Sequence, residues 1–209
     1  MVYSELVSLL KNYLQNEETA FVANIPDIVK QAEARIYSQV RTPDQRFSTS
    51  STVAAATFTT PAAFWEPLSL WITVSGAYVP LLQKQLSFIR TAYPSGTGQP
   101  SYYALSAATA SGVTITLGPT PDGTYTYTLD YIGDPTSVVT ASSTWISVNA
   151  PDALLYGSLL EGYIYMKGET DLREKFQTRF DAAMETLTKM CEGNQLIDEY
   201  RNPPIQVQG

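Results

Sequence analysis

Histidine is absent from the 209-residue chain, and cysteine occurs once, as Cys191. Without histidine the chain can form no Ser-His-Asp or Cys-His relay, no histidine-ligated metal site and no histidine pH switch. A single cysteine excludes an intramolecular disulfide and a cysteine-based zinc site, and it suits a reducing compartment. We therefore expect no metal and no cofactor. These absences do not exclude an enzyme that uses a pair of carboxylates, as glycosidases do.

Charge and long apolar runs are also scarce. Charged residues make up 16% of the chain, below the ~25% typical of soluble domains. The net charge of -7 is the opposite of the basic surface that nucleic-acid-binding proteins carry. No run of about 18 apolar residues occurs, so we expect no membrane span. The residues after Met1 lack the basic and apolar regions of a signal peptide, so we expect none.

The few charges are unevenly distributed. Residues 47–149 carry six charged side chains, and the other 106 residues carry the remaining 27. The six are Glu66, Lys84, Arg90, Asp122, Asp130 and Asp134. A neutral middle rich in serine, threonine and tyrosine, between two charged ends, predicts two structurally different domains.

Helical periodicity is present in both charged ends. Four segments have apolar residues at intervals of three and four: 3–14, 26–40, 152–166 and 171–191. Pro26 suits the first position of the second helix. Gly193 is expected to cap the last helix. Beyond it, Pro203 and Pro204 favour an extended path for residues 194–209.

Lys30, Glu33 and Arg35 fall mostly off the apolar stripe of their helix. Glu161, on an otherwise apolar face, is expected to form a structural ion pair with Arg179 or Lys175 rather than to act in catalysis.

The middle of the chain has the period of a strand. Tyr125, Tyr127 and Tyr131 alternate with polar residues, which predicts a half-buried strand with a tyrosine face. We predict an α+β fold: a helical domain from residues 1–46 and 150–193, an inserted antiparallel β domain at 47–149, and an extended C-terminal arm at 194–209.

No motif is a specific catalytic signature. The Ser8-Leu-Leu-Lys11 sequence matches the Ser-x-x-Lys of penicillin-binding enzymes but lacks the companion elements. Residues 96–98 (Gly-Thr-Gly) lack the further glycine and the lysine of a phosphate loop. Asp130 and Asp134 are the closest carboxylates of the β domain, and a solvated strand edge with a turn aspartate explains them better than acid or metal chemistry.

Tyrosine is abundant, with 14 residues. Tyrosines stack on bases or sugars, but the acidic charge argues against bases, because phosphate contacts usually supply the affinity. An apolar body with a hydroxyl group also suits a core boundary or a protein interface. We favour interface or core.

The C-terminal arm contains spaced apolar residues: Leu196, Ile197, Tyr200, Ile205 and Val207. A disordered end is one interpretation. On an extended, proline-stiffened segment such residues also suit docking in the groove of a partner, or addition to the edge of its sheet.

Five segments resemble phage head-to-tail adaptor proteins, a family similar to the tail tubular protein A of short-tailed phages. They are IPDIVKQAEARIY at 25–37, FIRTAYP at 88–94, GQPSYYA at 98–104, LGPTPD at 117–122 and LYGSLLEGYIYMKGE at 155–169. None is catalytic, and their joint order over residues 3–193 gives the resemblance its specificity.

The resemblance implies a virion structural protein rather than an enzyme. It implies a ring, usually of twelve copies, between the portal and the tail nozzle in the virion neck, assembled in the host cytoplasm. The helical part would face the portal and the β part the tail, with the arm along the portal. An acidic wall would let DNA slide through the lumen without specific binding.

The same resemblance suggests contact residues. Portal contacts are expected along the arm, at Leu196, Ile197, Tyr200, Arg201, Pro203, Pro204, Ile205 and Val207. Tail contacts are expected at Tyr125, Tyr127 and Tyr131. The alternative is a carbohydrate- or protein-binding module that uses the tyrosine-rich β domain, and an acid/base carboxylate hydrolase comes third.

Overall fold

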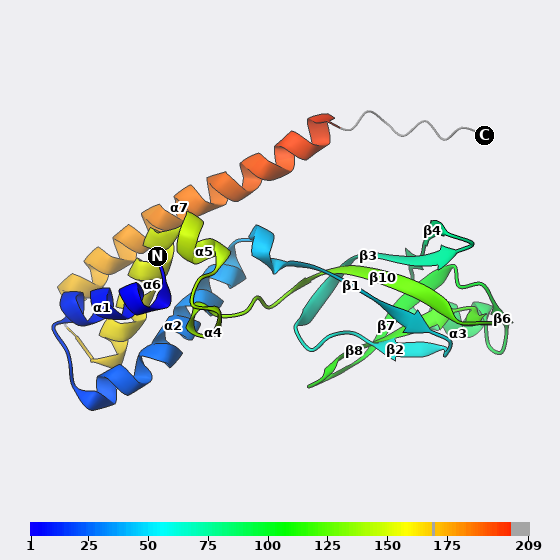
Figure 1. The fold of residues 1–209 in the computed structure, drawn as a ribbon, viewed down its shortest axis with the longest axis horizontal. Helices are drawn as coiled ribbons and strands as arrows, with labels where there is room; N and C mark the ends of the chain where they lie inside the picture. Colours follow the sequence, from blue (N-terminus) through cyan, green and yellow to red (C-terminus); the bar gives the residue numbers. More distant parts are fainter. Residues whose placement is uncertain (169, 202–209) are drawn as a thin grey trace. The chain divides into compact units, whose positions relative to one another are not determined.

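The computed structural model describes residues 1–168 and 170–201, with the backbone alone for residues 170 and 193–201. Mixed helix and strand content confirms the α+β class (Figure 1). The chain divides into a helical unit, Met1–Asp44 with Thr136–Gly209, and a sheet unit, Gln45–Pro135. The second boundary therefore comes earlier than the expected residue 150, because two short helices precede that point.

The helical unit is built around one central helix. Its elements are α1 (Tyr3–Leu14), α2 (Thr19–Gln39), α4 (Val138–Ala141), α5 (Trp145–Asn149), α6 (Pro151–Tyr165) and α7 (Thr170–Arg201). α6 contacts α1, α2, α5 and α7. A helix with neighbours on several sides needs apolar residues around most of its circumference. The sequence of α6, PDALLYGSLLEGYIY, meets this requirement.

Helix α2 begins seven residues before the predicted start at Pro26, which lies inside it. A proline within a helix removes one backbone hydrogen bond. The added turns bury Phe21 and Ile25, which are 2% and 1% exposed. Burial of these two side chains stabilises the segment by more than the lost bond costs, since each contributes about 1.5–3 kcal/mol.

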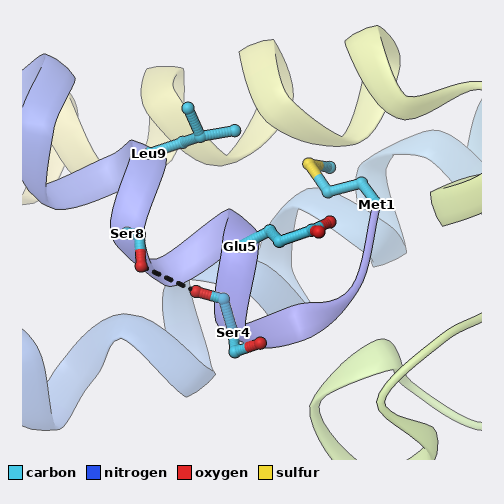
Figure 2. A pocket seen from close by; sticks show the side chains of 5 residues that line it. All are labelled: Met1, Ser4, Glu5, Ser8 and Leu9. Carbon is cyan, nitrogen blue, oxygen red and sulfur yellow. Dashed lines mark hydrogen bonds between the residues drawn. The ribbon is translucent and has the colours of Figure 1, made fainter.

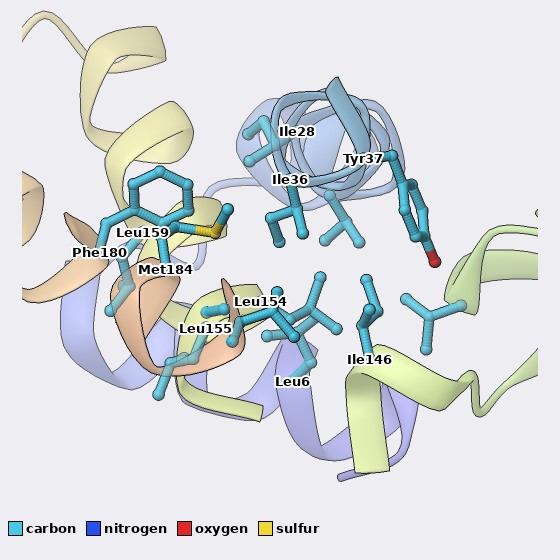
Figure 3. Close-up of a cluster of buried hydrophobic side chains, with 14 of the residues drawn as sticks. Leu6, Ile28, Ile36, Tyr37, Ile146, Leu154, Leu155, Leu159, Phe180 and Met184 are labelled. Atoms are coloured by element: carbon cyan, nitrogen blue, oxygen red, sulfur yellow. The ribbon is translucent and has the colours of Figure 1, made fainter. Parts of the chain in front are cut away.

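The core of the helical unit is a single apolar cluster (Figure 3). The side chains labelled there come from α1, α2, α5, α6 and α7: Leu6, Ile28, Ile36, Tyr37, Ile146, Leu154, Leu155, Leu159, Phe180 and Met184. Gly157 allows a close approach, since a Cβ there would lie 3.1 Å from the Phe180 ring and 3.4 Å from Ala32. The N- and C-terminal helices thus share one core, as their apolar stripes require.

Two carboxylates hold the chain where it leaves and re-enters the helical unit. Asp44 accepts hydrogen bonds from the Tyr37 hydroxyl at 2.9 Å and the Thr42 hydroxyl at 2.6 Å. Glu33 accepts one from the Val138 amide at 2.8 Å, at the start of α4. Glu33 is only 3% exposed, so the expectation that it lies off the buried stripe is wrong. Its partner is 105 residues away, beyond the reach of local periodicity.

The sheet unit is a sandwich of short strands. Its elements are β1 (Arg46–Val53), β2 (Thr57–Thr59), β3 (Phe64–Val74), β4 (Ala77–Pro80), β5 (Leu82–Gln83), α3 (Leu86–Ala92), β6 (Thr97–Gly98), β7 (Tyr102–Thr109), β8 (Gly112–Gly118), β9 (Thr120–Pro121) and β10 (Tyr125–Gly133). A 3₁₀ turn, Pro43–Gln45, precedes β1. One sheet has the order β1-β10-β3-β4, the second β2-β8-β7-β5, and β6 pairs with β9.

Most strands pair antiparallel, but β5–β7 and β6–β9 are parallel. In the first sheet Tyr127 lies opposite Ile72, and Leu129 opposite Leu70. Side chains from both four-stranded sheets form one apolar cluster, so the sheets pack face to face. Its members are Val53, Phe64, Leu70, Ile72, Leu81, Tyr103, Ile115, Leu117, Tyr127, Leu129 and Tyr131.

Among the described residues, no helix has both the length and the apolar character needed to cross a bilayer.

Candidate interaction surfaces

The C-terminal helix continues further than the sequence indicates. α7 runs from Thr170 to Arg201 without ending at Gly193. Residues 194–201 are therefore helical, and the prediction of an extended path is wrong for them. Gln, Leu, Glu and Arg in this stretch are good helix formers, and the first proline after them is Pro203. Residues 202–209, the other half of the predicted arm, lie outside the described residues.

Half of the predicted portal contacts lie on this helix. Leu196, Ile197, Tyr200 and Arg201 belong to α7. Pro203, Pro204, Ile205 and Val207 are outside the described residues. The last described side chain that α7 buries is Cys191, where burial and the Asp44 carboxylate both raise the pKa of the thiol. The ten residues from Glu192 to Arg201 add about 15 Å of helix beyond it.

An apolar surface lies where α7 passes the start of α6. A cavity of about 120 Å³ is lined there by residues 149–153 and by Ala183, Thr186, Leu187 and Met190 of α7. Met190 is 39% exposed, and Val148 nearby in sequence is 60% exposed. Exposed apolar side chains that border a hollow are typical of protein contacts.

Figure 2 shows a second, more open hollow beside the first turns of α1. It has a volume of about 510 Å³ and is lined by Met1, Ser4, Glu5, Ser8 and Leu9. Ser8 is exposed and donates a hydrogen bond to the Ser4 carbonyl at 2.9 Å. A serine within a helix commonly makes such a bond to the carbonyl four residues earlier. The bond therefore agrees with a chance match of Ser8 and Lys11 to the Ser-x-x-Lys motif.

The three tyrosines expected at the tail contact differ in exposure. Tyr127 and Tyr131 are 8% and 6% exposed and belong to the sandwich core. Tyr127 packs on Phe58 with the ring centres 4.3 Å apart. Tyr125 is half-exposed, and its hydroxyl donates to Asp122 at 2.6 Å. Of this strand's three tyrosines, Tyr125 is therefore the one with substantial exposed surface.

The carboxylates considered for catalysis have structural partners or are simply exposed. Asp130 accepts a hydrogen bond from the Ser69 hydroxyl at 2.6 Å, and that hydroxyl accepts one from the Trp71 indole at 2.8 Å. Asp134 is exposed. Among the side chains that the structure describes, those of residues 1–168 and 171–192, no group of three metal-ligating side chains comes together.

Glu161 forms an ion pair, but with a different partner from the expected ones. Its Oε1 lies 3.0 Å from Nη1 of Arg35 on α2. Arg35 also lies over the Phe180 ring of α7, 5.7 Å from its centre. Arg179 instead donates to the Tyr156 hydroxyl at 3.2 Å. Helical spacing alone does not reveal the Arg35 pair, because it depends on how α2 packs against α6.

Sequence periodicity does not reveal a surface around α3, which we name the basic-aromatic patch. Its centre is Leu82, Lys84, Phe88 and Tyr102, and we count with it Arg90, an exposed residue farther along α3. Lys84 Nζ lies 5.7 Å from the centre of the Phe88 ring and 5.9 Å from that of Tyr102. The two rings meet edge to face at 5.4 Å. A signal was available, because Lys84 and Arg90 are the only charges between Glu66 and Asp122.

Comparison with known families decides the class of protein. The family model described as SU10 adaptor protein matches residues 1–207. The chain belongs to this family. Comparison with curated proteins gives no match. The adaptor is therefore a structural protein of a phage, which confirms the resemblance to the phage head-to-tail adaptors.

For an adaptor, the useful features are exposed surfaces rather than a cleft. Three stand out among the described side chains: the hollow between α6 and α7, the hollow on α1, and the basic-aromatic patch. The first two belong to the helical unit and the third to the sheet unit.

Proposed function

We propose that this adaptor forms a ring that joins the portal to the tail nozzle and lines the channel through which DNA leaves. The observation that carries the proposal is the family match over residues 1–207. Twelve copies is the number that the resemblance suggests. The ring would belong to the virion neck and would assemble in the host cytoplasm.

The portal contact is proposed for the end of α7 and the residues that follow it. Leu196 and Tyr200 are four residues apart on a helix and so share a face, as do Ile197 and Arg201. The hollow lined by Leu187 and Met190 lies on the same helix, nearer the bundle. Helices that present an apolar face commonly dock in a groove of a partner.

The tail contact is proposed for the sheet unit, with a smaller role for the tyrosine strand than the sequence suggests. Tyr125 is the one tyrosine of the three with exposed surface. Trp65, Leu68 and Tyr78 of the same unit are 42%, 53% and 69% exposed. These side chains are available to a nozzle protein.

The channel lining is proposed to be acidic. The chain carries 20 acidic and 13 basic residues, and 16 of the acidic ones are in the helical unit. A wall that repels phosphates allows DNA to slide, whereas a basic wall would retain it. A basic lumen in an image of the assembled ring would contradict this part of the proposal.

The portal contact can be tested with two truncations. Removal of residues 194–209 is expected to leave a folded protein that binds the portal of the same phage poorly. Removal of residues 202–209 alone separates the role of the helix end from that of the last eight residues. If the protein without residues 194–209 bound the portal normally, the proposed portal contact would be eliminated. Helical content and thermal melting, measured by circular dichroism, serve as the folding control.

Single substitutions refine the test. Tyr200→Ala is expected to weaken docking by about 1–3 kcal/mol per copy if the side chain is buried in the portal. Thr178→Ala, at an exposed position on the same helix, is the matched control. Because contacts repeat around a ring, a small loss per copy becomes a large loss of avidity. Native mass measurement of the adaptor–portal mixture gives both the affinity and the copy number.

A further inference from the structure

The basic-aromatic patch is rigid and carries an unbalanced charge. Ile89 of α3 is 3% exposed and packs toward Gly118 of β8, where an added Cβ would lie 3.0 Å from it. Tyr93 packs toward the same glycine and lies 6.1 Å from the Tyr102 ring. Because α3 is packed on the sandwich, its backbone needs no ordering when a partner binds.

The patch also exposes apolar surface around its two cations. Leu82 is 58% exposed and Phe88 41% exposed. Lys84 and Arg90 are both exposed, and within the described part of the chain neither forms an ion pair. An exposed aromatic centre with uncompensated positive charge fits an acidic partner that carries an apolar or aromatic side chain.

The helical unit contains a surface of the complementary kind, which we name the acidic corner: Tyr13, Glu17 and Glu18, where α1 turns into α2. All three side chains are exposed, Tyr13 by 53%. No basic residue occurs between Lys11 and Lys30. The bases near this end are Lys11, in the last turn of α1, and Lys167, next to Met166, which accepts a hydrogen bond from Asn16 at 3.3 Å. Among the described residues neither Glu17 nor Glu18 forms an ion pair, so both carboxylates are open to a cationic partner.

The acidic corner is also held in one conformation. Gln15 has a φ of 48°, and the Asn16 amide donates to the Lys11 carbonyl at 3.3 Å. The Glu18 amide donates to the Asn16 side chain at 2.9 Å. These bonds fix the backbone of the turn from which the two exposed glutamates project.

We propose that the basic-aromatic patch of one copy docks on the acidic corner of a second copy, with Lys84 and Arg90 facing Glu17 and Glu18. Different surfaces then meet at each contact, and such a heterologous contact closes a ring when the rotation allows it. The inference rests on the proposed ring and names its lateral contact. The second copy is favoured over DNA because the chain is acidic overall, and a DNA site usually needs many basic residues.

Reversing the charges on each side tests the contact. The patch-reversed variant is Lys84→Glu with Arg90→Glu, and the corner-reversed variant is Glu17→Lys with Glu18→Lys. Copies per portal ring are counted by native mass measurement, and self-association without the portal is measured by sedimentation. Each variant alone is expected to lose at least about tenfold in association, since like charges then face each other. An equal mixture of the two is expected to regain assembly, because every contact can again join opposite charges.

Controls separate this contact from other effects. Arg173→Glu with Lys175→Glu makes the same charge change at exposed positions of α7 and is expected to leave copy-to-copy association unchanged. Lys84→Gln with Arg90→Gln removes the charges without adding repulsion, so it is expected to give an intermediate loss. If a reversed variant unfolds, as judged by circular dichroism, this neutral pair carries the test.

The outcomes distinguish the inference from the ring proposal. Rings of normal copy number from either reversed variant, or failure of the mixture to recover, would overturn the inference while leaving the ring intact. If the patch-reversed variant formed normal rings but retained less DNA, the patch would be assigned to DNA contact. This result would also overturn the inference. If the wild-type protein forms no ring on the portal, the ring proposal fails. The inference then stands only if wild-type copies associate in solution and the reversed variants do not.

Discussion

The helical unit and the sheet unit of this adaptor are stabilised by different kinds of polar contact. The helical unit carries 26 of the 33 charged residues, and charged side chains connect its elements: Glu33 to the start of α4, and Glu161 to Arg35. The sheet unit carries seven charges, and hydroxyl groups and backbone amides supply most of the polar contacts between its strands, such as Ser50 with Thr128 at 2.9 Å.

The difference follows from how each unit satisfies its backbone. Strands pair their amides and carbonyls with one another, so side chains are left to fill the core or face solvent. Helices satisfy their backbone internally, except at their ends, and what joins one helix to another is the side chains alone. A helical unit therefore depends on a few long-range polar contacts, whereas a sandwich depends on the geometry of its turns.

The largest expected effect comes from removing one core leucine in each unit. Leu154→Ala in α6 and Leu129→Ala in β10 each open a cavity at a fully buried position and are expected to lower the free energy of unfolding by about 2–5 kcal/mol. Because the two cores are separate clusters, each change is expected to shift the unfolding of its own unit only.

Urea unfolding followed by two signals checks this separation. Helix loss at 222 nm reports on the helical unit. Fluorescence of Trp65 and Trp71 reports on the sheet unit once Trp145 is replaced by phenylalanine. If Leu154→Ala moved both transitions equally, the units would unfold as one, and the comparison between them would lose its thermodynamic basis.

The second prediction concerns turn geometry in the sheet unit. Gly112 has a φ of 133°, and an added Cβ there would overlap the Thr60 carbonyl oxygen. Gly112→Ala is expected to destabilise the sheet unit by about 1–3 kcal/mol, because this conformation is strained for any residue with a side chain. Gly123→Ala is the matched control, since nothing lies within 4 Å of a Cβ at that position. Equal thermal stability of the two variants would contradict the role of the turn.

A third, comparable prediction applies to the helical unit. Glu33→Ala removes the acceptor of the Val138 amide and leaves a buried donor without its partner, at a cost of about 1–3 kcal/mol. Glu33→Gln keeps an acceptor oxygen at nearly the same place and is expected to cost less. Chemical denaturation of both variants checks the difference. If Glu33→Gln lowered the free energy of unfolding more than Glu33→Ala, Glu33 would not act through its bond to the Val138 amide.

These residues also show how far the sequence predicts the structure. The apolar periodicity of α1, α6 and α7, the alternation in β10 and the neutral composition of the middle predict the α+β class and the helices that share a core. Periodicity concerns neighbours within one element, so it could not give the partners of Glu33 or Glu161, which lie on other elements. It also placed the end of α7 at Gly193, because a single glycine is a common helix terminator but a permitted helix residue.

The candidate contacts were harder to predict than the fold. Alternation of tyrosine with polar residues indicates one buried face of a strand, but it does not say whether that face meets the second sheet or a partner protein. For Tyr127 and Tyr131 the second sheet covers it. Periodicity does not reveal the basic-aromatic patch, because its members come from β5, the segment between β5 and α3, α3 and β7, and only the fold brings them together.

The smallest expected effect is on the ionisation of Tyr125, and it distinguishes two causes within one strand. The hydrogen bond from Tyr125 to the Asp122 carboxylate raises the pKa of the phenol, because the bond requires the protonated hydroxyl. For Tyr127 and Tyr131 burial raises the pKa instead. Asp122→Asn is therefore expected to lower the pKa of Tyr125 toward its ordinary value of about 10 and to leave the pKa of the other two unchanged.

Titration of the ring carbons by NMR resolves the three residues separately. The sign of the effect on stability follows from the raised pKa. The Tyr125 bond contributes fully to stability at pH values below the ordinary pKa of tyrosine. Its contribution disappears as the pH rises through the higher pKa of Tyr125 in the folded protein. In the Asp122→Asn variant this loss is expected to shift to lower pH. An unchanged pKa of Tyr125, or a shift shared with Tyr127, would assign the raised value to the sandwich as a whole rather than to one exposed hydrogen bond.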